Sequence, residues 1–169
     1  MAVREKNKTS KSFLLLVLLQ SVQIAAHSQD ARTIKVNNLY SCLKEYDIEC
    51  PKTVLAVAIY ETGWMECKHC TYQFNNLFGF RANHDYLRFK DIYECLEYLK
   101  VWQATYYDPW KAKHPKGTYY EYLAHVKYAH ANMSHYLLII RSIEHLIAKD
   151  VKQMDDAPFT YPSVETEGR

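Results

Sequence analysis

The residue best suited to do chemistry in this sequence is Glu61, because its neighbours favour an uncharged carboxyl group. An apolar run begins at Pro51, a residue that the first turn of a helix tolerates, and Gly63 supplies a left-handed stop just beyond Glu61. A carboxyl group there lies near the negative end of the helix dipole, between Tyr60 and Trp64 in the sequence. Both influences raise its pKa, and a carboxyl group that stays protonated near neutral pH can serve as a general acid.

Two blocks of sequence, one on each side of a loop, resemble a known enzyme family. The first is AIYETGW at residues 58–64, and the second is NNLFG at residues 75–79. Together they resemble the glucosaminidase domain of glycoside hydrolase family 73. Three further stretches are similar to later motifs of that family: YLRF at residues 86–89, GTYYEYL at residues 117–123 and the pair Tyr128-Ala129.

The resemblance covers residues from about 35 to 148 and implies both a fold and a function. The implied fold is lysozyme-like, and the implied reaction is hydrolysis of the β-1,4 bond after N-acetylglucosamine in peptidoglycan. Glu61 aligns with the catalytic acid of the family, and Tyr128 aligns with a tyrosine of its active site. Two departures, at Met65 and at the residues after the Tyr-Ala pair, allow a member with altered substrate choice or lost activity.

Glycosidic cleavage also needs a group that manages the cation-like sugar carbon, and a second carboxylate commonly does so. Asp85 is our first candidate for that role, and Asp91 and Glu66 are alternatives. The N-acetyl group of the substrate is a further alternative, which removes the need for a second carboxylate. Each of the two aspartates also has a structural interpretation, Asp91 as a helix N-cap and Asp85 as a turn residue.

Five residues are candidates for contacts with the sugar: Trp64, Asn75, Asn76, Phe78 and Tyr86. Amide side chains suit the acetamido group, and flat aromatic rings stack on the apolar faces of pyranoses. The chain has 15 tyrosines, which fit either a sugar cleft or half-buried helix faces. The two asparagines could instead form turns, and the aromatic residues, Tyr128 included, could instead belong to the core.

The first 28 residues have the pattern of a signal peptide. Four basic residues precede an apolar stretch that starts at Phe13, and Ala26 and Ser28 fit a cleavage site before Gln29. We therefore expect a protein exported to the periplasm or the cell exterior, with no stable membrane insertion; an uncleaved signal anchor is the alternative. Residues 29–169 carry 17 basic and 18 acidic side chains, which argues against a nucleic-acid partner.

Five cysteines in an exported chain allow at most two internal disulfides, and their pairing cannot be read from the spacing. Cys67 and Cys70 form a CxxC pair with His69 between them, a spacing found in zinc sites. No second pair accompanies it, so a disulfide or buried thiols are favoured over zinc. We expect no metal and no cofactor.

Hydrophobic periodicity predicts a mainly α fold, with about five helices and one small β-hairpin. We expect one domain over residues 29–150 and a disordered tail at residues 151–169. We expect helices at residues 33–46 and 51–62 and a hairpin of residues 77–81 and 86–90. A capped helix from Asp91, ended by Asp108-Pro109, is followed by a polar loop at 110–116 and a second capped helix from Thr118. The last helix follows Ala131-Asn132, and its buried stripe includes Tyr136.

Together these features predict an exported, lysozyme-like endo-β-N-acetylglucosaminidase that acts on peptidoglycan glycan strands. A lytic transglycosylase on the same fold is the first alternative. A catalytically inactive module that binds peptidoglycan or serves wall assembly is the second, and a small exported metal-binding protein is the third.

Overall fold

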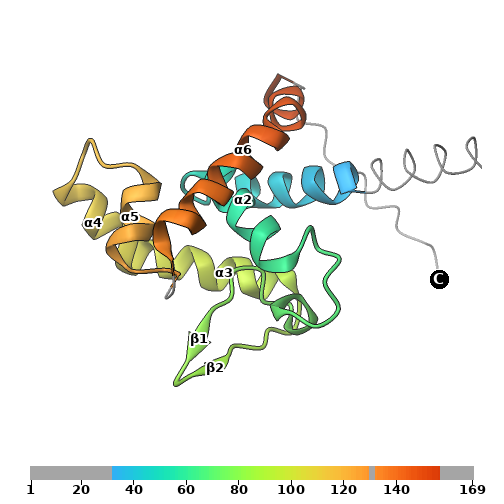
Figure 1. Cartoon of the computed structure of the whole chain (residues 1–169), viewed down its shortest axis with the longest axis horizontal. Coiled ribbons are helices and arrows are strands. Elements are labelled where there is room, and N and C mark those ends of the chain that lie inside the picture. The colour runs from blue at the N-terminus through green and yellow to red at the C-terminus, as the bar shows by residue number, and fades with distance from the viewer. Residues whose placement is uncertain (1–31, 130–131, 157–169) are drawn as a thin grey trace, which may run out of the picture.

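The computed structural model describes residues 32–129 and 132–156, and within them the fold is mainly helical with one small hairpin, as predicted (Figure 1). The elements in chain order are a helix at residues 32–45, α2 (Pro51–Thr62), the 3-10 turn η1 (Thr71–Phe74), β1 (Arg81–Ala82), β2 (Asp85–Tyr86), α3 (Ile92–Trp102), the π-helical turn η2 (Gln103–Tyr107), α4 (Asp108–Lys113), α5 (Tyr119–His125) and α6 (Met133–Asp156).

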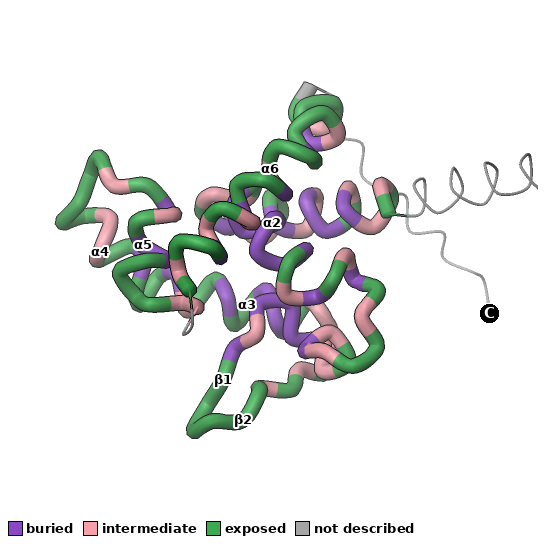
Figure 2. The backbone as a smooth tube through the Cα atoms, viewed as in Figure 1, coloured by how far each residue is buried: buried purple, intermediate pink, exposed green. Residues whose placement is uncertain are grey.

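Helix α2 lies in the middle of the molecule and packs mainly against α6 (Figure 1). The buried residues of α2 lie on all sides of the helix, and Leu55, Ala56 and Ala58 among them are fully buried. Figure 2 shows most of this helix as buried. A helix that is apolar on every side is stable only inside a core. Pro51 opens α2 and Gly63, in the left-handed conformation, closes it, as predicted. The core therefore fixes the position of the last turn of α2, which carries Glu61.

The hairpin is shorter than we expected. Only Arg81–Ala82 and Asp85–Tyr86 pair, with Arg81 opposite Tyr86, and the strands expected over residues 77–81 and 86–90 are wrong over most of their length. Asn83 and His84 both have positive φ angles, of 50° and 83°, which is the conformation of a tight two-residue turn. This turn brings the side chains of Arg81 and Tyr86 together.

The helix that begins after Asp91 does not end at Asp108-Pro109, contrary to the prediction. It continues through η2 into α4, so Trp110 to Lys113 are helical and do not form a loop. In η2 the Asp108 N–H donates to the Gln103 carbonyl, five residues back. This wider turn accommodates Pro109, whose ring would clash with the carbonyl four residues back in an unbroken α-helix.

The two predicted helix caps are present in different degrees. Thr118 and Glu121 exchange both hydrogen bonds of a capping box at the start of α5. Asp91 accepts from the Glu94 N–H at 2.9 Å, but the Glu94 carboxylate accepts from the Lys90 N–H instead of the Asp91 N–H. Asp91 is thus an N-cap at the start of α3, and the reciprocal half of its capping box is missing.

Helix α6 extends to Asp156, so the disordered tail expected from residue 151 was wrong for its first six residues. Val151 is buried, and the Asp155 carboxylate accepts from the Tyr40 hydroxyl at 3.0 Å and from Lys44 at 3.1 Å. Residues 157–169, like the predicted signal peptide at residues 1–28, lie outside the described residues. Within residues 32–129 and 132–156, the structure contains no helix that is long and apolar enough to span a membrane.

Candidate active site

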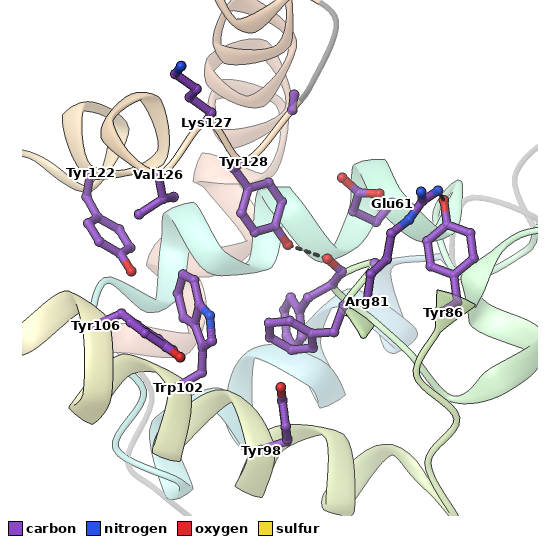
Figure 3. Close-up of a pocket in the computed structure, with 14 residues that line it drawn as sticks. Glu61, Arg81, Tyr86, Tyr98, Trp102, Tyr106, Tyr122, Val126, Lys127 and Tyr128 are labelled. Carbon is purple, nitrogen blue, oxygen red and sulfur yellow. Dashed lines mark hydrogen bonds between the residues drawn. The ribbon is translucent and has the colours of Figure 1, made fainter. Parts of the chain in front are cut away.

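A cleft of about 810 Å³ lies beside the last turn of α2 (Figure 3). Residues from α2, the hairpin region, α3, η2, α5 and the segment after α5 line it. They are Glu61, Phe78, Gly79, Phe80, Arg81, Tyr86, Tyr98, Trp102, Tyr106, Tyr122, Val126, Lys127, Tyr128 and Ala129. The cleft therefore contains Glu61, Tyr128, Phe78 and Tyr86 of the residues that the sequence singled out.

The Glu61 carboxyl group is half-buried at the wall of this cleft, and burial raises its pKa above the usual range of a glutamate. The raised pKa agrees with the sequence prediction, and desolvation is its largest cause. Two groups act in the opposite direction: the Tyr136 hydroxyl donates to Glu61 Oε1 at 3.2 Å, and the Arg81 guanidinium attracts the carboxylate. The environment thus favours the protonated acid and also holds two groups that stabilise the carboxylate left after proton transfer.

Gly79 lies directly against the Glu61 carboxyl group. Its φ angle is +67°, and a Cβ atom built on it would lie 3.0 Å from Glu61 Oε2. The left-handed backbone and the close approach both favour glycine at this position. The NNLFG block therefore places its glycine where the acid needs space.

Arg81 lies between Glu61 and Tyr86 at one end of the cleft (Figure 3). Its guanidinium is 4.1 Å from the centroid of the Tyr86 ring and donates to the Tyr86 hydroxyl. The short hairpin makes this pair, because Arg81 and Tyr86 are opposite one another across the two strands. Sequence reasoning missed Arg81, although its register relative to Tyr86 follows from a two-residue turn at Asn83 and His84.

Two tyrosines, one from the segment after α5 and one from α6, complete the region around the acid. The Tyr128 hydroxyl donates to the Phe78 carbonyl (Figure 3), and its ring lies 5.9 Å from that of Tyr136. Burial raises the pKa of Tyr128 well above its usual value, so the phenol is neutral near pH 7. Tyr136, which the sequence placed in the buried stripe of the last helix, is buried as predicted and also contacts Glu61.

The structure does not bring Asp85, our first candidate for the second catalytic carboxylate, into the cleft. Asp85 is exposed and pairs with Ala82 in the hairpin, so it is not a turn residue either. Asp91 caps α3, and Glu66 forms an ion pair with Arg32 at 2.9 Å. Among the described residues that line the cleft, Glu61 alone carries a carboxyl group.

Three of the residues expected to contact the sugar have structural roles outside the cleft lining. Asn76 is fully buried; its amide donates to the Phe80 and Leu87 carbonyls at 2.8 and 3.0 Å and accepts from the Phe80 N–H at 2.9 Å. Asn75 ends η1 and donates to the backbone that precedes α3. The Arg32 guanidinium lies over the Trp64 ring, 5.9 Å from the ring centroid. The asparagines shape the loop that carries Phe78 and Gly79.

All five cysteines are unpaired thiols in this structure. Cys95 is buried and the other four are half-buried; the Cys70 thiol donates to the Cys67 carbonyl at 3.4 Å. In the described part of the chain, no group of three or more His, Cys, Asp or Glu side chains is arranged to hold a metal ion.

No protein-family model, no curated protein and no solved structure matches this chain. The mainly α fold with one hairpin is established from the structure itself. The resemblance to glycoside hydrolase family 73 rests on the motifs quoted above and stays a prediction, and so does the lysozyme-like architecture.

Proposed function

We propose that this chain is an exported endo-β-N-acetylglucosaminidase that hydrolyses the β-1,4 bond after N-acetylglucosamine in peptidoglycan. The observation that supports this most is the half-buried Glu61 carboxyl group, with its raised pKa, at the wall of a cleft rich in aromatic rings. A protonated carboxyl group can give its proton to the glycosidic oxygen of the leaving sugar. Arg81 and Tyr136 then stabilise the carboxylate that remains.

The second role in the reaction falls to the substrate, because the described cleft lining contains no carboxyl group besides Glu61. The carbonyl oxygen of the N-acetyl group attacks the anomeric carbon while the bond to the leaving oxygen breaks and Glu61 protonates that oxygen. Water then opens the cyclic intermediate, with Glu61 as the base that accepts its proton. This course limits substrates to 2-acetamido sugars and retains the anomeric configuration, since the carbon is attacked twice.

The same single carboxyl group also favours a second candidate, the lytic transglycosylase. In that reaction Glu61 also protonates the leaving oxygen as the glycosidic bond breaks. A hydroxyl group of the sugar itself then attacks the anomeric carbon and gives its proton to the Glu61 carboxylate, so no second carboxylate and no water are needed. The product is an anhydro sugar instead of a reducing end. The two candidates therefore differ in the mass of their products by one water molecule.

Digestion of purified peptidoglycan tests the proposal, with the released fragments read by mass spectrometry. We expect fragments that end in reducing N-acetylglucosamine from the wild-type protein and none from Glu61→Gln. Asp85→Asn is the matched control and retains activity, because Asp85 lies outside the cleft. Anhydromuramic ends would move the assignment to the transglycosylase, and wall binding without fragments from any variant would identify an inactive binding module.

A further inference from the structure

The part of the cleft remote from Glu61 is built from four aromatic residues to which the proposed reaction gives no role. Tyr98 and Trp102 come from α3, Tyr106 from η2 and Tyr122 from α5. We call these four residues the aromatic arm. In Figure 3 Trp102, Tyr106 and Tyr122 lie on the other side of Tyr128 from Glu61 and Arg81, and Tyr98 lies below Tyr128.

The π-helical turn η2 aligns three of these rings along one wall. Tyr98, Trp102 and Tyr106 follow one another at intervals of four residues, and eight residues of α-helix overshoot two full turns by about 80°. The wider η2 turn advances less per residue and cancels part of that overshoot. All three side chains consequently reach the cleft. Single π-helical turns inside α-helices occur frequently at functional sites.

The wall is fixed in place and yet open to solvent. The Trp102 ring lies 5.9 Å from Tyr106 and 5.5 Å from Tyr122, and Tyr98 packs on Phe80 at 4.9 Å. Tyr106 is nevertheless 56% exposed and Tyr98 40% exposed. Rings that are already held by neighbours lose little conformational freedom when a ligand covers them.

Tyr122 supplies a polar group that has no protein partner. The residue is 1% exposed, and none of the described residues forms a hydrogen bond with its buried hydroxyl group. A buried hydroxyl left without a partner is costly, so such groups need an explanation. Tyr122 lines the cleft, and its hydroxyl points toward Trp102 and Tyr106 (Figure 3). A polar group of a ligand bound at the aromatic arm would satisfy it.

We propose that the aromatic arm is a sugar-binding subsite that takes an N-acetylated pyranose of the glycan, away from the bond that is cleaved. The inference rests on the proposed function, which supplies the class of ligand. A pyranose matches the arm in two respects: its C–H face stacks on aromatic rings, and the polar groups at its rim can bond to the Tyr122 hydroxyl. The arm then holds the substrate strand, while Glu61 and Arg81 act at the other end of the cleft.

Isothermal titration calorimetry with the pentasaccharide of β-1,4-linked N-acetylglucosamine tests the proposal in the Glu61→Gln background, where the ligand is not cleaved. We expect Tyr106→Ala to bind about three- to tenfold more weakly, since one stacked ring is lost. Tyr93→Ala is the matched control, because Tyr93 is 50% exposed on α3, the helix that continues into η2, but lies outside the cleft lining. It is expected to bind as the parent does.

Tyr122→Phe separates a binding role from a structural one. Removal of a hydroxyl group without a protein partner leaves the melting temperature unchanged or higher, but weakens pentasaccharide binding about three- to tenfold. Weaker binding in either arm variant, with Tyr93→Ala unaffected, supports the proposal. Unchanged affinity in both arm variants, or no binding by the parent, overturns it.

The proposed reaction is assayed separately on the same pentasaccharide with Glu61 intact. Binding that depends on the aromatic arm without any cleavage would reject the glycosidase and retain the subsite. If Tyr106→Ala and Tyr122→Phe cleave the pentasaccharide as fast and bind it as tightly as the parent does, the glycosidase is retained and the subsite is rejected.

Discussion

Tyr136→Phe should move the pKa of Glu61 upward, because it removes one of the two groups that favour the carboxylate. The Tyr136 hydroxyl donates to Glu61 Oε1 at 3.2 Å, and burial, the larger influence, acts in the opposite direction. A hydrogen bond to a charged group contributes about 1.5–3 kcal/mol, and one pKa unit corresponds to 1.36 kcal/mol. The bond is long for its type, so we take the lower end and expect a rise of about one unit.

The pH profile of hydrolysis and a direct titration both measure this shift. A general acid loses activity as pH rises through its pKa, so the alkaline limb of kcat/KM should move to higher pH in Tyr136→Phe. Carbon-13 NMR of the Glu61 carboxyl group, assigned by its loss in Glu61→Gln, gives the same pKa without any activity. Tyr120→Phe is the control, since Tyr120 bonds to Glu144, outside the cleft lining.

An unchanged or lowered pKa of Glu61 in Tyr136→Phe would refute the reasoning, because it would mean that Tyr136 does not stabilise the carboxylate. A shift of the same size in Tyr120→Phe would also refute it, since the effect would then reflect a general change in packing. Loss of activity at every pH, with the NMR titration shifted as expected, would assign Tyr136 a further role in positioning the carboxyl group.

Four further predictions concern Glu61, Gly79, Asn76 and Asp155. Glu61→Gln should raise the melting temperature at pH 7 and lose that advantage toward pH 4, because a carboxyl group with a raised pKa is destabilising only above its unfolded pKa. Gly79→Ala should lower the free energy of unfolding by about 1–2 kcal/mol in chemical denaturation, since its φ is +67°. It should also slow hydrolysis, because its Cβ would crowd Glu61. Asn76→Asp should cost about 3 kcal/mol or more in the same assay, because a buried amide loses two donated hydrogen bonds; a stable variant that fails only in sugar binding would contradict this. Asp155→Asn should cost about 1 kcal/mol at pH 7, and the difference from wild type should shrink below pH 4, because Lys52 and its neighbours lower the pKa of Asp155 to about 2.

The part of the site that could be predicted from the sequence is the part that local signals determine. Pro51, an apolar run and Gly63 lie within thirteen residues, and together they give the length of α2, its burial and the place of Glu61 at its end. The burial of Tyr136 followed from helical periodicity in the same way. Its hydrogen bond to Glu61 did not, because the two residues are 75 positions apart and only the packing of α6 on α2 brings them together.

The wrong predictions have two physical causes. Asn75 and Asn76 were interpreted as sugar ligands, but their amide groups donate to backbone carbonyl groups in the irregular segments beside the hairpin, those of Phe89 and Phe80 among them. Asp108-Pro109 was interpreted as a helix end, because proline rules assume an α-helical turn. The turn η2 is π-helical, so that assumption does not hold here, and no residue pattern in this segment predicts such a turn.

These two errors bear on the same feature, the breadth of the cleft. Because the asparagines hold the loop before the hairpin, Gly79 and Arg81 can lie close to Glu61 and define the end of the cleft where the acid acts. Because η2 continues the helix beyond Trp102, Tyr106 extends the opposite wall. The acid is thus positioned by local signals on a buried helix, whereas the surface that faces a substrate is set by tertiary contacts. Substitutions in α2 should therefore affect stability and catalysis together, and substitutions in η2 should affect ligand affinity first.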